Sequence, residues 1–283
     1  MGPGLGSPPG IQASGLVSVP PQGGRPDPRT HGAASKLRAV ETFWITATAV
    51  LWGAGAGLLI PRASYRLSVP PGEPWRSACP AGHPLTGIGN GWLGRASCCE
   101  GDRYGPNTPI LTAVTATACA LLAAAVGARP ELVIWLLLVP AGVLLAAVDS
   151  KVHRLPDIVT VPFTAAALVL LGGAALLPHA GGCWTTALLG SLTLGACYLL
   201  LFLINPKGIG FGDVKLAPAL GAALGWYGWN TLLLGTFTGY LFGAAYGAGL
   251  ILTRRAAGTS AIPLGPFLMA GTFTGILFGS HTI

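Results

Sequence analysis

Long apolar segments separated by short polar loops constrain this sequence more than any other feature. Only 9% of the 283 residues are charged, against about 25% in soluble globular domains, so such segments cannot all lie inside a water-soluble fold. Backbone polar groups in hydrocarbon must be satisfied within their own segment, which makes each segment a helix. The sequence therefore predicts an all-α fold, a polytopic membrane helix bundle of about eight transmembrane helices. The predicted spans are 40–60, 110–127, 131–148, 158–177, 184–204, 216–232, 232–252 and 263–279.

The regions between these segments divide the chain into four parts. Residues 1–38 are rich in Gly, Pro and Ser and have no apolar run, which indicates a disordered tail or a start codon assigned too early rather than a secretory signal. Residues 39–60 are the first transmembrane helix, and 61–109 form a cytoplasmic loop domain. Residues 110–283 form a membrane-embedded domain.

The Lys and Arg residues predict the orientation of the bundle, since cytoplasmic loops carry an excess of them. If 61–109 is cytoplasmic, eleven basic residues share its side, and five, four of them in the tail, lie on the other side. The net charge of +7 is thus a topology signal, and no clustered basic face indicates nucleic-acid binding. The eleven are Arg62, Arg66, Arg76, Arg95, Arg103, Lys151, Arg154, Lys207, Lys215, Arg254 and Arg255.

Glycine recurs every fourth residue at 235, 239, 243 and 247, within the seventh predicted span. This spacing places the four residues on one stripe of a helix. Small residues let neighbouring membrane helices approach closely, so we interpret the stripe as a helix-packing surface.

Three of the nine acidic residues, Asp149, Asp157 and Asp213, lie where helices meet the cytoplasmic side. Asp149 closes the third span and Asp213 follows the fifth. The residues between them suffice for two spans and a turn, so the chain returns to its starting side and both carboxylates lie at one membrane depth. Ionisable residues at membrane segments are costly and are functional candidates by default.

Two carboxylates at one depth suggest an aspartyl protease pair. Like charges a few ångströms apart cannot both ionise, so such a pair shares a proton. The ionised partner can take a proton from water while the protonated partner polarises the scissile carbonyl. Gly208, Gly210 and Gly212 favour this reading, because residues without a Cβ allow a substrate backbone to come close.

Simpler roles are open for the same carboxylates. Asp213 and Asp157 could each cap the helix that follows. Asp149 could pair with Lys151 or Arg154 at a wet surface, where an ion pair contributes little to stability.

Three motifs resemble one known family, the type IV prepilin peptidases, which mature pilins and pseudopilins. Residues 208–226, GIGFGDVKLAPALGAALGW, resemble the family's Gly-x-Gly-Asp segment. Residues 148–162, VDSKVHRLPDIVTVP, resemble its other catalytic segment, and 261–271, AIPLGPFLMAG, resemble the start of its last helix. The resemblance implies that Asp149 and Asp213 are catalytic, and that Gly210, Gly212, Lys215 and Asp157 bind substrate or support the site.

The family's cytoplasmic domain often carries two Cys-x-x-Cys pairs, which suit tetrahedral zinc. The corresponding loop here has Cys79-Pro-Ala-Gly-His83 and Cys98-Cys99, so the candidate metal ligands are Cys79, His83, Cys98 and Cys99. The peptidase reaction itself requires no cofactor. S-adenosylmethionine would be a cofactor only if the chain retains the N-methyltransferase activity of bifunctional members.

We therefore expect a membrane aspartyl endopeptidase that removes the basic leader peptide of prepilin-like proteins at the cytoplasmic face of the inner membrane. The expected partners are prepilin or pseudopilin substrates and the lipid bilayer, and no nucleic acid. One alternative is a presenilin-like protease that cuts within transmembrane helices. Another is a small, non-enzymatic transporter whose carboxylates bind ions.

Overall fold

The computed structural model describes Gly2 and residues 28–70, 72–98, 103–206, 208–253 and 263–281, without the side chains of residues 28–35 and 38. Within these ranges the chain forms nine helices and no β-strand. The helices are α1 (Pro28–Leu67), α2 (Ile88–Gly91), α3 (Thr108–Val126), α4 (Glu131–Val152), α5 (Asp157–Ala174), α6 (Trp184–Ile204), α7 (Phe211–Trp226), α8 (Trp229–Leu252) and α9 (Gly265–Gly279).

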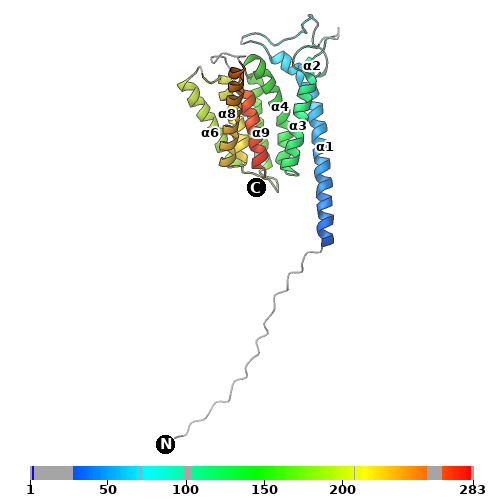
Figure 1. Ribbon diagram of the computed structural model, residues 1–283, viewed down its shortest axis with the longest axis vertical. Coiled ribbons are helices and arrows are strands. Elements are labelled where there is room, and N and C mark those ends of the chain that lie inside the picture. Colours follow the sequence, from blue (N-terminus) through cyan, green and yellow to red (C-terminus); the bar gives the residue numbers. More distant parts are fainter. Residues whose placement is uncertain are drawn as a thin grey trace. The chain divides into compact units, whose positions relative to one another are not determined.

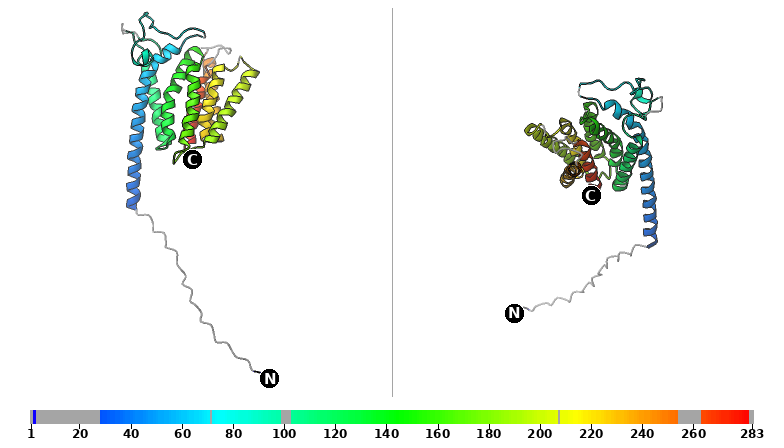
Figure 2. Two further views of the ribbon diagram at one scale, coloured as in Figure 1. Left: turned by 180° about the vertical axis from the view of Figure 1, so that it is seen from behind. Right: turned by 45° about the horizontal axis from the view of Figure 1, so that its top comes forward.

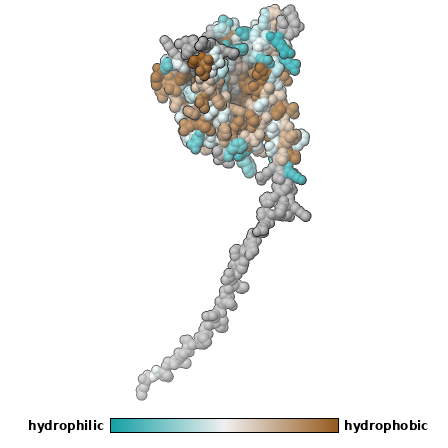
Figure 3. Space-filling view, viewed as in Figure 1, coloured by the Kyte–Doolittle hydropathy of each residue, from teal (hydrophilic) through white to brown (hydrophobic). Residues whose placement is uncertain are grey.

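Each predicted span coincides with one of the eight long helices, which confirms the all-α membrane bundle. Five of them, α1 from Ala39 onward and α3 to α6, are long and apolar enough to cross a membrane, and α9 is a shorter apolar helix. Large hydrophobic side chains lie exposed along these helices, as the brown surface in Figure 3 shows. In water such a surface would be a site of aggregation, whereas in a bilayer it contacts lipid.

A short turn separates the sixth and seventh predicted spans, earlier in the chain than their shared boundary at residue 232. Helix α7 ends at Trp226, α8 begins at Trp229, and Gly228 between them has a φ of 104°. Residues with a Cβ rarely adopt that conformation, so glycine suits the turn.

Glycines bring the membrane helices into close contact. Gly190 of α6 and Gly221 of α7 face each other so closely that a Cβ on either would collide with the partner's backbone. The predicted stripe on α8 is buried, and Gly235 and Gly239 approach the backbone of Gly271 in α9. The stripe is thus a helix-packing surface, as its spacing predicts.

The first loop begins later than predicted because α1 continues past Pro61 to Leu67. A proline inside a helix removes one donor and disturbs the carbonyls before it. Gly94 of the loop compensates here: its N–H donates to the carbonyl of Leu59, and its carbonyl accepts the N–H of Arg62, each at 3.1 Å. The loop is thereby fastened to the helix where Pro61 interrupts it.

The turns that carry the predicted functional residues share one end of the bundle with this loop. Figures 1 and 2 show α3 to α9 running alongside one another, with the segment that carries α2 at one end. The turn between α4 and α5 meets that segment, since Nη1 of Arg154 donates to the carbonyl of Pro70 at 3.3 Å. Residues 1 and 3–27 of the predicted tail lie outside the described part of the chain.

A buried polar cluster closes the opposite end. The carboxylate of Glu131, at the start of α4, is fully buried and accepts the N–H of Gly181 at 3.1 and 3.2 Å. Nη1 of Arg129 donates to the carbonyl of Ser280, just beyond α9, at 3.1 Å. These bonds satisfy groups that would otherwise be costly to bury.

Candidate active site

Asp149 lies in the last turn of α4 and is buried, with 5% of its surface exposed. The helix ends three residues later at Val152, and His153 caps it in a left-handed conformation, with its N–H donating to the carbonyl of Asp149 at 2.8 Å. Pro156 then precedes the start of α5 at Asp157. A proline here prevents α4 from continuing, so the chain turns immediately after the acid.

Asp213 lies in the first turn of α7 and is also buried, with 7% of its surface exposed. The N-cap residue is Gly210, and the backbone N–H of Asp213 donates to its carbonyl at 3.0 Å. No side chain caps this helix, so Asp213 is not the N-cap that a simpler reading of the sequence allowed. Its carboxylate is available for another role.

The two carboxylates meet at Gly265, the first residue of α9. A Cβ placed on Gly265 would lie 2.7 Å from Oδ2 of Asp149 and 3.6 Å from Oδ1 of Asp213. The two oxygens are therefore no farther apart than the sum of these distances. Asp149 and Asp213 are called the carboxylate pair below.

Gly265 is a site residue that the sequence prediction missed. Its segment, 261–271, was recognised only as the start of the last helix. The one available signal was a glycine between two prolines, Pro263 and Pro266, which marks a turn but does not identify its neighbours.

One oxygen of the carboxylate pair has no hydrogen-bond partner among the described residues. Oδ2 of Asp149 is buried and has no hydrogen-bond partner within the described ranges. Nearly all buried polar atoms in proteins are paired, so an unpaired carboxylate oxygen needs an explanation such as a catalytic role. Asp149 also forms no ion pair with Lys151 or Arg154 in the part of the chain that the structure describes.

Lys215 and Asp157, both expected near the site, instead contact each other. Nζ of Lys215 lies 2.6 Å from Oδ1 of Asp157 and 4.6 Å from the centre of the Phe211 ring. The side chains are 29% and 62% exposed, so the ion pair contributes at most about 1 kcal/mol to stability. It nevertheless joins the turn that follows Asp149 to the helix that carries Asp213.

The two predicted site glycines lie in different surroundings. A Cβ on Gly210 would lie 3.4 Å from Oδ2 of Asp213, so this position borders the carboxylate pair directly. A Cβ on Gly212 would lie 3.3 Å from the backbone nitrogen and Cβ of Leu155. The space left by Gly212 thus allows α7 to pack against the turn between α4 and α5.

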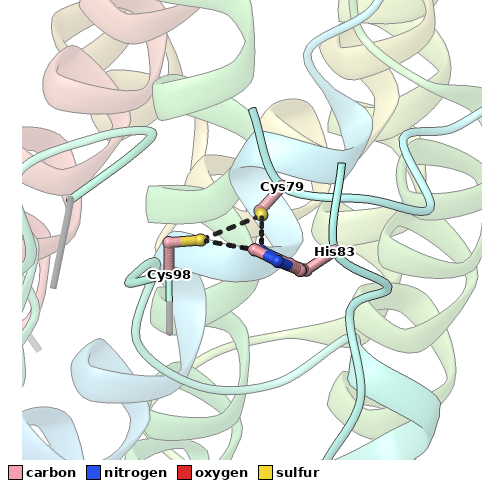
Figure 4. A group of neighbouring side chains, drawn as sticks. All are labelled: Cys79, His83 and Cys98. Carbon is pink, nitrogen blue, oxygen red and sulfur yellow. Dashed lines mark hydrogen bonds between the residues drawn. The ribbon is translucent and has the colours of Figure 1, made fainter. Parts of the chain in front are cut away.

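A cluster of metal-binding side chains lies in the loop between α1 and α3 (Figure 4). Sγ of Cys79 lies 3.1 Å from Sγ of Cys98 and 3.7 Å from Nδ1 of His83, and Sγ of Cys98 lies 3.5 Å from the same nitrogen. With zinc–sulfur bonds of about 2.3 Å and zinc–nitrogen bonds of about 2.0 Å, tetrahedral zinc holds sulfur and nitrogen about 3.6 Å apart and two sulfurs about 3.8 Å apart. The two sulfur–nitrogen distances match these values, and the two sulfurs would have to separate by only about 0.7 Å, so the three residues fit the metal. Cys99, the fourth predicted ligand, lies outside the described residues.

The thiols of this cluster are suited to metal binding. The hydrogen bond with Cys98, followed by hydrogen bonds from His83, lowers the pKa of Cys79 from 9.0 to about 7 against the effect of desolvation. Thiolate, not thiol, is the metal-binding form. The lowered pKa of Cys79 therefore favours the form that binds a metal.

Comparison with known proteins gives one family. Residues 132–248 match the sequence model of the type IV leader peptidase family. A protein of Aeromonas hydrophila named prepilin leader peptidase/N-methyltransferase is 37% identical over 220 residues, which are 72% of this chain and 70% of that protein. Proteins with the same name from Burkholderia pseudomallei (34%; 74% of this chain, 67% of that one) and Pseudomonas aeruginosa (30%; 73% and 71%) are also similar. No solved structure matches the chain.

Proposed function

Because this chain belongs to the type IV leader peptidase family and its described part has five helices long and apolar enough to cross a membrane, we propose that it is a membrane aspartyl endopeptidase that removes the leader peptide of prepilin-like proteins. The names of these relatives support both the peptidase reaction and prepilins as the class of substrate. The convergence of Asp149 and Asp213 on Gly265 supports the aspartyl mechanism, and it is the observation that carries the proposal.

The chemistry follows from two buried carboxylates at short range. Buried like charges repel strongly, so the pair holds one proton between its two members. The ionised carboxylate takes a proton from the attacking water, and the protonated one donates a hydrogen bond to the carbonyl oxygen of the scissile peptide. The two members then exchange roles as the leaving amine is protonated. Titration belongs to the pair rather than to either residue.

The proposed cleavage takes place at the cytoplasmic face of the inner membrane. Most of the basic residues in the loops fall on the side of the carboxylate pair, and the positive-inside rule assigns that side to the cytoplasm. A substrate with a basic leader would place its scissile bond at this face, with the apolar segment that follows in the bilayer.

The loop cluster is proposed to bind a structural zinc ion. Cys79, His83 and Cys98 would be three of its ligands, and the geometry above supports this assignment. The cluster lies in a loop with little apolar core, so the metal would supply folding free energy there. The carboxylate pair does not depend on it chemically.

The relatives' names also include an N-methyltransferase, and the corresponding reaction here would be N-methylation of the new amino terminus. S-adenosylmethionine would be the methyl donor. The mass of the mature product shows whether methylation occurs, independently of cleavage. A methyl group adds a defined increment to the mass of the amino-terminal fragment.

The test is substitution of each acid with its amide. Asp149→Asn and Asp213→Asn should insert into the membrane normally and abolish processing of a co-expressed prepilin, since loss of a general acid or base costs about 10²–10⁴-fold. Asp157→Asn is the control, because its carboxylate lies at the same end but is exposed and paired with Lys215. It should retain most of the activity.

The products distinguish the alternatives. Cleavage just before the apolar segment, seen by mass spectrometry, supports a leader peptidase, whereas cleavage inside that segment would indicate a presenilin-like protease. Full processing by either Asp149→Asn or Asp213→Asn would refute the aspartyl pair. A transporter would cleave no prepilin at all.

A further inference from the structure

A large apolar groove adjoins the carboxylate pair. It has a volume of about 540 Å³ and is lined by residues of α3, α4, α5, α7 and α9. Its size falls in the range of ligand sites, which is about 300–1,000 Å³. Nearly all of its lining side chains are apolar, and the helices that form it are those of the membrane bundle.

The groove runs lengthwise along the bundle. On α4 its lining extends from Trp135 to Ala146, which corresponds to about 17 Å of helix at 1.5 Å per residue. On α9 it extends from Pro266 to Ile276 over the same depth. The groove is therefore long enough for about three turns of an apolar helix lying parallel to α4 and α9.

One end of the groove reaches the carboxylate pair. Ala146 lies one helical turn before Asp149, and Pro266 directly follows Gly265, against which both acids lie. Oδ2 of Asp149, in a residue more than nine-tenths buried, has no hydrogen-bond partner in the described part of the chain. This oxygen lies against Gly265, the residue next to Pro266 at that end of the groove.

We propose that the groove docks the apolar helix of the substrate directly after the scissile bond. A lipid chain would match the apolar walls equally well, but the position of the groove beside the carboxylate pair favours a polypeptide, which brings both an apolar helix and a peptide bond. An amphipathic or apolar helix that lays one face into a groove is a common mode of peptide recognition. The proposal rests on the peptidase function proposed above and extends it to the part of the substrate that is not cleaved.

Gly142 offers a selective way to fill the groove. It lies in the middle of the lining of α4, and the one atom near a Cβ placed there is Sδ of Met269, at 3.9 Å. Gly142→Ala should therefore be tolerated, while Gly142→Phe projects a ring into the space that the substrate helix would occupy. Gly249→Phe is the matched control, because Gly249 lies exposed on α8, outside the groove, with open space around it.

The experiment compares two substrates of the full-length protein in vesicles. One is an intact prepilin, and the other is a short peptide that spans the same scissile bond without the apolar segment. Gly142→Phe should raise KM for the intact prepilin by about tenfold or more and leave cleavage of the short peptide unchanged, since a tenfold change corresponds to about 1.4 kcal/mol of binding. Gly249→Phe should match the wild type with both substrates.

Three results would overturn the proposal. The first is an unchanged KM of Gly142→Phe for the intact prepilin, and the second is an equal loss with both substrates, which would indicate a damaged site. The third result comes from a crosslinking experiment. A photo-crosslinking residue is placed at position 118, on the α3 wall of the groove, in the Asp149→Asn variant. It should capture the apolar segment of the prepilin, and capture of lipid alone would refute docking.

The crosslinking experiment distinguishes the docking proposal from the proposed peptidase function. If the wild-type protein cleaves no prepilin, the proposed peptidase function fails. Capture of the apolar segment from position 118, but not from the exposed Leu170 on α5, would then still support docking. Absence of capture at position 118 would reject docking whatever the catalytic result.

Discussion

Replacement of Gly265 by alanine should inactivate the protein while leaving its fold intact. The added Cβ would lie 2.7 Å from Oδ2 of Asp149 and 3.2 Å from its Cγ. To reach an ordinary contact of 3.4 Å, the carboxylate must withdraw by about 0.7 Å, or α9 must move away from it by as much. Either shift widens or rotates the carboxylate pair.

The size of the effect follows from this displacement. A misplacement of about 1 Å costs a catalytic site about 10²-fold, so we expect the cleavage rate to fall about 10- to 100-fold. The cost in stability is smaller, about 1–3 kcal/mol for an overpacked contact, and alanine at the first turn of a helix offsets part of it. Single-turnover cleavage of a prepilin, with thermal unfolding in detergent, measures the two quantities separately.

Two other glycines serve as controls. Gly249→Ala adds a methyl group to open space on α8 and should cleave at the wild-type rate. Gly271→Ala collides with the backbone of Gly235 and Gly239, so it should lose stability rather than activity alone. A folded Gly265→Ala protein that cleaves at the wild-type rate would refute the reasoning, because the carboxylate pair would then not require the geometry found at Gly265.

Two further predictions concern groups outside the membrane. The purified protein should contain about one zinc ion per chain, and His83→Ala should lower that content as measured by mass spectrometry of the metal; an unchanged content would exclude His83 as a ligand. The hydroxyl of Thr185, with backbone groups at the start of α6, lowers the pKa of Cys183 from 9.0 to about 7, so its alkylation by a maleimide should speed up as the pH rises through about 7, where the reactive thiolate forms. Thr185→Val should raise this pKa and slow the reaction at pH 7, whereas equal rates in the two proteins would contradict the assigned cause.

Much of the fold could be predicted because the bilayer allows few solutions. Apolar runs of sufficient length must be helices, and counting them places Asp149 and Asp213 at one end of the bundle. The packing role of the glycine stripe on α8 could be predicted equally well, since a four-residue spacing defines one helix face. These are local or periodic signals that need no knowledge of tertiary contacts.

The remaining features depend on contacts between segments far apart in the sequence. The convergence on Gly265 requires the start of α9 to lie between two acids on α4 and α7, which no spacing reveals. The predicted first span ends at residue 60, whereas α1 continues to Leu67, because Gly94, a loop residue more than thirty positions after Pro61, bonds to the helix on both sides of the proline. The ion pair between Lys215 and Asp157 likewise joins two sequence motifs, 208–226 and 148–162, whose contact in space no local pattern indicates.

The buried cluster at the opposite end has a consequence for biogenesis. Arg129 donates to the carbonyl of Ser280, a residue that the ribosome adds 151 positions later. Until α9 and the residue after it have been synthesised, the guanidinium has no access to this partner. A chain that stops before α9 would leave Arg129 without this bond. We expect such truncated chains to be degraded quickly.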